Sequence, residues 1–99
     1  MKKQKSVLVV EPDHDVRVEI RSMLEKNDYM VVSTANGNDA FSLLQEMTMP
    51  SLILLSSNPG LLYRDKFLSQ IGSEERFNTI PVLHLLRTED LKHILELSL

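Results

Sequence analysis

Residues 7–13 of the chain read VLVVEPD. The run of branched apolar residues at Val7–Val10 predicts a strand that is buried on both faces, as in a parallel sheet covered by helices. Asp13, which follows this run closely, is a favourable N-cap for a helix. This stretch therefore predicts the first strand of a covered sheet and, directly after it, the first helix.

Further apolar runs occur at Met30–Val32, Leu52–Leu55 and Val82–Leu86. After each run, apolar residues recur at the three- and four-residue spacing of a helix. The four helical stripes are Val16, Ile20, Met23 and Leu24; Ala40, Leu43, Leu44 and Met47; Phe67, Leu68 and Ile71; and Leu91, Ile94 and Leu95. Strands that alternate with helices predict right-handed βαβ crossovers and a parallel sheet. We therefore expect residues 1–99 to form one domain, a three-layer α/β sandwich.

The composition is that of a globular protein, with 42% hydrophobic and 25% charged residues. A net charge of −3 gives no reason to expect nucleic acid as a direct partner. The chain has no cysteine, which excludes disulfides and thiolate metal sites. Its apolar runs are too short to cross a bilayer, so we expect a cytoplasmic protein without membrane association. No histidines stand at metal-ligand spacing, and we expect neither a metal nor a cofactor.

From Ser6 to about Asp90 the chain resembles the receiver domain of bacterial two-component response regulators. Five segments carry this resemblance in the family's order, namely residues 7–13, 29–32, 35–40, 50–55 and 80–86. The resemblance implies a flavodoxin-like sheet with strand order 2-1-3-4-5. It also implies a functional site at the carboxyl ends of the strands, where such folds bind their ligands.

In this family an aspartate at the end of the third strand accepts a phosphoryl group, and an acidic pair after the first strand helps to hold a divalent cation. A hydroxylated residue at the end of the fourth strand and a lysine after the fifth strand sense the phosphate. In this chain Ser56 stands at the phosphoacceptor position and Leu86 at the switch position. Pro12 replaces the direct metal ligand, and Glu11 and Asp13 are what remains of the acidic pocket.

These replacements remove the chemistry of the family's site. A serine without a strong base is a poor nucleophile, and a single remaining carboxylate is a poor magnesium ligand set. The resemblance therefore implies a degenerate receiver, or pseudo-receiver, that is not an enzyme. We expect a phosphorylation-independent regulatory module that binds a signalling or transcription protein.

Receiver domains have five βα units, and the sequence shows four, without the usual fifth strand and helix. We therefore expect Val82–Leu86 to form an exposed apolar edge, which is a hazard for pairing with other strands. We also expect Leu91, Ile94 and Leu95 to remain in water unless something covers them. The predicted interaction surface consists of Val82, His84, Leu91, Ile94 and Leu95, and we favour a homodimer.

Two alternatives remain open. The chain could be the N-terminal part of a longer response regulator whose output domain carries the function. It could also be an enzyme that uses Glu11, Asp13, Ser56 and Asn58 at the ends of the strands. A Ser56, His84 and Asp13 triad is not expected, because His84 lies in an apolar run that predicts a buried core histidine.

Overall fold

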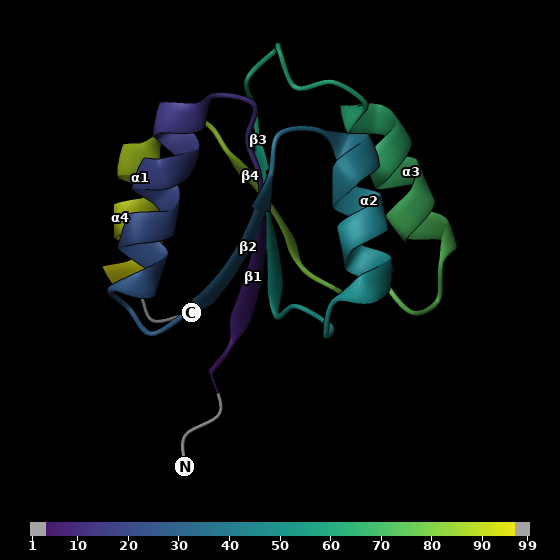
Figure 1. The fold of residues 1–99 in the computed structure, drawn as a ribbon, viewed down its shortest axis with the longest axis horizontal. Helices are drawn as coiled ribbons and strands as arrows, with labels where there is room; N and C mark the ends of the chain where they lie inside the picture. The colour runs from purple at the N-terminus through teal and green to yellow at the C-terminus, as the bar shows by residue number, and fades with distance from the viewer. Residues whose placement is uncertain (1–3, 97–99) are drawn as a thin grey trace.

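The computed structural model describes residues 4–96 and contains four strands and four helices in strict alternation (Figure 1). In chain order these are β1 (Ser6–Val10), α1 (His14–Glu25), β2 (Met30–Thr34), α2 (Gly37–Glu46), β3 (Leu52–Ser56), α3 (Arg64–Ser73), β4 (Val82–Leu85) and α4 (Thr88–Glu96). Each predicted apolar run contains a strand, although Leu86 lies just beyond β4. Each predicted stripe lies on a helix, except that Met47 directly follows α2. No helix within this part of the chain is long and apolar enough to span a bilayer.

The strands form one parallel sheet in the order β2-β1-β3-β4. Leu8 of β1 pairs with Val32 on one side and with Ile53 on the other, and Ile53 in turn pairs with Val82 of β4. This order confirms the predicted flavodoxin-like sheet with about four βα units. It leaves β2 and β4 as the two edge strands.

The helices cover both faces of the sheet, with α1 and α4 on one face and α2 and α3 on the other (Figure 1). Side chains of β1 alternate between two cores, because successive residues of a strand point to opposite faces. Val7 and Val9 pack under α1 and α4, whereas Leu8 and Val10 pack under α2 and α3. The predicted three-layer sandwich is therefore confirmed.

The helix starts are held by local hydrogen bonds and by one close backbone approach. The Asp13 side chain accepts from the Val16 N–H at the start of α1, at 3.1 Å. At the start of α2, Gly37 donates its N–H to the Leu62 carbonyl at 2.9 Å. A Cβ on Gly37 would lie 2.2 Å from the carbonyl oxygen of Tyr63. The absence of a side chain at Gly37 thus lets the β3–α3 loop rest on α2.

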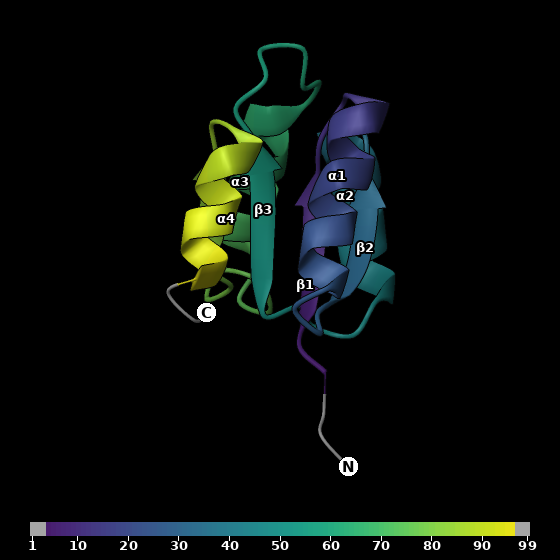
Figure 2. The same cartoon turned by 90° about the vertical axis from the view of Figure 1, so that its left-hand side faces the viewer.

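One expectation about the last helix is wrong. Leu91 was assigned to an interaction surface that a partner would have to cover, but it is completely buried and joins the core formed with Ile20, Leu24 and Leu85. The physical reason is that α4 folds back beside α1 (Figure 2) and packs against β4. Leu95 is half-buried against the same core.

The expectation that His84 is a core residue is also wrong, because His84 is exposed. An apolar run predicts a strand with covered faces, but β4 is an edge strand and its cover is incomplete. Val82 packs against the core under α2 and α3, whereas His84, two residues further along the same face, does not. The carboxyl half of β4 is therefore accessible on that face.

Candidate functional site

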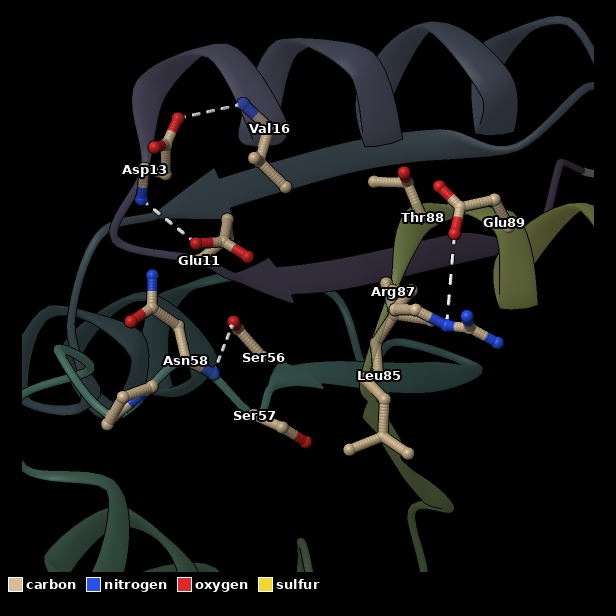
Figure 3. Close-up of a pocket in the computed structure, with 12 residues that line it drawn as sticks. Glu11, Asp13, Val16, Ser56, Ser57, Asn58, Leu85, Arg87, Thr88 and Glu89 are labelled. Atoms are coloured by element: carbon tan, nitrogen blue, oxygen red, sulfur yellow. Dashed lines mark hydrogen bonds and ion pairs between the residues drawn. The ribbon is translucent and has the colours of Figure 1, made fainter.

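A pocket of about 450 Å³ opens at the carboxyl ends of β1, β3 and β4 (Figure 3). Its walls come from three connections that leave these strands, so residues far apart in the sequence meet there. The lining residues are Glu11, Asp13, Val16, Ser56, Ser57, Asn58, Pro59, Leu85, Leu86, Arg87, Thr88 and Glu89. The predicted site residues Glu11, Asp13, Ser56, Asn58 and Leu86 are thus brought together in one place.

Glu11 is the buried carboxylate of this pocket, with only 5% of its surface exposed. Its Oε2 accepts from the Asp13 N–H at 2.9 Å. Its backbone is fixed on both sides, because its N–H donates to Thr34 at 3.0 Å and its carbonyl accepts from Arg17 at 2.8 Å. Pro12 follows directly and brings no side-chain oxygen.

Asp13 and Glu11 do not form a ready-made cation site. Asp13 is exposed, and one of its oxygens is occupied by the helix cap on Val16. Within residues 4–96 no group of three or more histidine, cysteine or acidic side chains is placed to hold a metal ion. Mg²⁺ prefers several oxygen ligands, carboxylates among them, and the described residues do not assemble such an acidic group here.

Ser56 is the last residue of β3 and is 5% exposed. Its Oγ accepts from the Asn58 N–H at 3.1 Å, which closes a turn immediately after the strand. The same loop is held further by the Asn58 Oδ1, which accepts from the Gly60 N–H at 2.8 Å. Arg64 also donates to the Asn58 carbonyl at 2.8 Å. Ser56 therefore serves the turn that follows β3.

The β4 side of the pocket holds residues that the sequence analysis missed. Arg87 follows Leu86, and Thr88 and Glu89 begin α4 (Figure 3). The Arg87 Nε lies 3.8 Å from Glu89 Oε2, and its Nη2 lies 3.5 Å from Asp90 Oδ1. A threonine before two acidic residues is a typical helix start, and this signal could have located them at the end of the strand.

The residues of the predicted interaction surface separate into two groups. His84 is exposed, and Val82, Ile94 and Leu95 are half-buried, so all four are at least partly accessible. Leu91 is completely buried and does not belong to any surface. His84 does not line the pocket, so the structure does not bring it together with Ser56 and Asp13 as a triad.

No protein-family model matches the chain, and no curated protein matches it by sequence. Solved structures do match it. The phosphorylated cyanobacterial phytochrome response regulator RcpA is 24% identical, with a TM-score of 0.72 over 98% of this chain and 77% of that one. The chemotaxis response regulator CheY4 of Vibrio cholerae is 17% identical, with a TM-score of 0.74 over 97% and 82%.

A signal receiver domain of a histidine kinase from Syntrophus aciditrophicus is 23% identical, with a TM-score of 0.71 over 93% of this chain and 71% of that one. These neighbours are described as response regulators or as a signal receiver domain. The architecture of residues 4–96 is therefore that of response-regulator receiver domains.

Proposed function

We propose that this protein is a regulatory protein-interaction module that uses a receiver fold without phosphoaspartate chemistry. One observation carries the proposal: the side chain that ends β3 inside the pocket is Ser56, whose oxygen is engaged in a turn with Asn58. A receiver that signals by phosphorylation needs a carboxylate there. The partner we expect is a signalling or transcription protein in a two-component system, and neither nucleic acid nor a membrane.

The neighbouring positions support the same conclusion. Pro12 has no oxygen for a cation, and Leu86 has no hydroxyl for a phosphoryl group. Phosphoryl transfer depends on positioning and on neutralising the charge of the phosphoryl oxygens. The RcpA structure is of a phosphorylated regulator, and another neighbour, the response regulator Rcp1, was solved in an Mn²⁺-bound form. In this chain Glu11 and Asp13 are the acidic remnant of a site of that kind.

The test is incubation of the full chain with acetyl phosphate and Mg²⁺, followed by intact-mass measurement, with RcpA as the positive control. We expect the mass of the chain to remain unchanged while RcpA gains phosphate. A stable added phosphate on the wild-type chain would overturn the proposal.

The Ser56→Asp variant extends this test to the rest of the pocket. We expect it to remain unmodified as well, because Pro12 and Leu86 still occupy the metal-ligand and switch positions. Ser57→Asp, which adds the same charge to the next pocket residue, is the matched control. Phosphate on Ser56→Asp but not on Ser57→Asp would show that the acceptor alone was missing, and that the pocket is otherwise competent.

We further propose that the partner surface lies on β4 and α4, around Val82, His84, Ile94 and Leu95. These accessible residues lie on the strand that ends the sheet and on the helix that follows it. A second copy of the chain is the partner that we favour for the strand edge.

A further inference from the structure

We infer that two copies of this chain associate through the open edge of β4, antiparallel to each other, about a two-fold axis that passes beside His84. The two parallel sheets then continue into one another. This inference rests on the proposed interaction surface and assigns its partner, its orientation and its register.

The hydrogen bonds of β4 show which of its backbone groups are free to pair. Ile53 donates its N–H to the Pro81 carbonyl, and Ser57 donates to the Leu85 carbonyl, each at 3.0 Å. Pro81 and Leu85 thus direct their carbonyls toward β3. Successive residues of a strand direct their backbone groups alternately to the two sides, so every second residue faces away from β3. Val82 and His84 therefore direct their N–H and C=O groups to the open edge. Within residues 4–96, no side chain or loop hydrogen-bonds to those groups.

The opposite edge of the sheet is partly covered. Met30 donates its N–H to the Lys5 carbonyl at 2.9 Å, and the Thr34 carbonyl accepts from the Glu11 N–H at 3.0 Å. The backbone groups of Val31, which alternates with them, therefore face away from β1. The Arg21 guanidinium of α1 covers that position, because Nη1 donates to the Val31 carbonyl at 3.1 Å. Its Nη2 donates to the Ser33 Oγ at 3.0 Å. A charged side chain on an edge strand is a common way to hinder edge pairing. Among residues 4–96, β2 has such a side chain bonded to it and β4 has none.

When two copies of β4 pair antiparallel, apolar side chains of one strand lie opposite apolar side chains of the other. Val82 and His84 share one face of the strand, and Leu86 follows as the most exposed large apolar residue of this part of the chain, at 77%. Antiparallel pairing centred on His84, with the strand extended by one residue, sets Val82 opposite the second copy's Leu86. Both apolar side chains then lose water contact, which favours association.

The position of Leu86 favours this register over the neighbouring one. A centre at Leu83 would pair Val82 with His84 and leave Leu86 outside the contact. Strand β4 contains no aspartate, glutamate, lysine or arginine, so its self-pairing sets no such charges opposite one another. The His84-centred register satisfies the outward groups of Val82 and His84 and covers Leu86 as well.

The first test is the solution mass of the full chain by light scattering across a concentration series. We expect a dimer for the wild type. His84→Glu places two carboxylates directly opposite each other, and we expect the dimer dissociation constant to rise at least about tenfold. His93→Glu adds the same charge on the exposed side of α4 and should leave the dimer intact. A monomeric wild type, or equal effects of the two variants, would overturn the inference.

The second test fixes the register and uses the absence of cysteine from the chain. Directly opposed, hydrogen-bonded residues of antiparallel strands have Cα atoms about 5.5 Å apart, which a disulfide can bridge. Under mild oxidation His84→Cys should form a covalent dimer, whereas Val82→Cys, which faces Leu86, should not. A dimer that cross-links through Val82→Cys and not through His84→Cys would overturn the register.

These tests and the phosphodonor test fail separately. A monomer that does not accept phosphate would overturn the edge pairing and leave the proposed pseudo-receiver function standing. A dimer that accepts phosphate at a pocket residue would overturn the pseudo-receiver function and leave the edge pairing standing. Binding of a different protein to the β4 edge of a monomeric chain would replace the second copy as the occupant and so overturn the inference.

Discussion

Single residues at the carboxyl end of the sheet decide what the pocket can do. Sequence alone placed Glu11, Asp13, Ser56 and Asn58 there, since the carboxyl ends of parallel strands share one edge of the sheet. It could not show that the Ser56 hydroxyl is engaged by the Asn58 N–H, because that bond depends on the geometry of the loop. Their assignment to the family's positions remains a proposal.

A second contact at this scale was beyond sequence reasoning. Gly37 and Tyr63 are far apart along the chain, and no pattern in the sequence links a helix start to a distant loop. We expect Gly37→Ala to destabilise the fold by about 1–3 kcal/mol, because the new methyl group would collide with the Tyr63 carbonyl and the loop would have to shift. Urea unfolding of the purified variant measures this change.

The matched control is Gly72→Ala in α3, where an added Cβ meets nothing within 4 Å. Helical alanine is favoured over glycine by about 0.5–1 kcal/mol, so this variant should gain stability. Equal effects of the two substitutions would show that the close approach at Gly37 does not constrain the fold.

At the scale of elements, the alternation of strands and helices was predictable, and the face chosen by the last helix was not. The right-handed crossover rule assigns α1, α2 and α3 to their faces, because each of them connects two parallel strands. No described strand follows α4, so the rule is silent there. This is why Leu91 was assigned to an interaction surface, although α4 in fact buries it beside α1. The error over His84 has a related origin, since apolar runs do not reveal how completely an edge strand is covered.

The burial of Leu91 makes α4 an integral part of the fold. We expect Leu91→Ala to lower the free energy of unfolding by about 2–5 kcal/mol, as do other truncations of fully buried leucines. Leu62→Ala, which shortens a 63% exposed leucine, should change it by less than about 0.5 kcal/mol. Urea titration followed by circular dichroism compares the two. A negligible effect of Leu91→Ala would mean that α4 is not packed on the sheet in solution.

For the molecule as a whole, apolar burial stabilises the fold and ion pairs contribute little. Two apolar cores lie on the two faces of the sheet. The ion pairs of the described chain all involve accessible side chains, as in the pair of Arg21 with Glu25, which are 39% and 54% exposed. Exposed pairs of this kind typically contribute less than about 1 kcal/mol.

The stability should therefore depend little on salt. We expect the free energy of unfolding to change by less than about 1 kcal/mol between low and moderate NaCl concentrations. The ion pairs that salt would screen are exposed and contribute little to that free energy. Arg87→Ala, which removes two ion pairs at once, should have an equally small effect. Urea unfolding at several salt concentrations measures both. A steep loss of stability with added salt would show that charge interactions hold the fold together.

The guanidinium that covers β2 has a consequence for how far assembly can proceed. A sheet with two open edges can pair head to tail, β4 of one molecule against β2 of the next, and such contacts repeat without end into a fibre. Within residues 4–96, Arg21 is bonded to Val31 and Ser33 on the β2 edge, and β4 carries no such cover. In the proposed dimer the two β4 edges pair with each other, and Arg21 hinders a further copy from adding at β2. We therefore expect a closed pair and not a polymer.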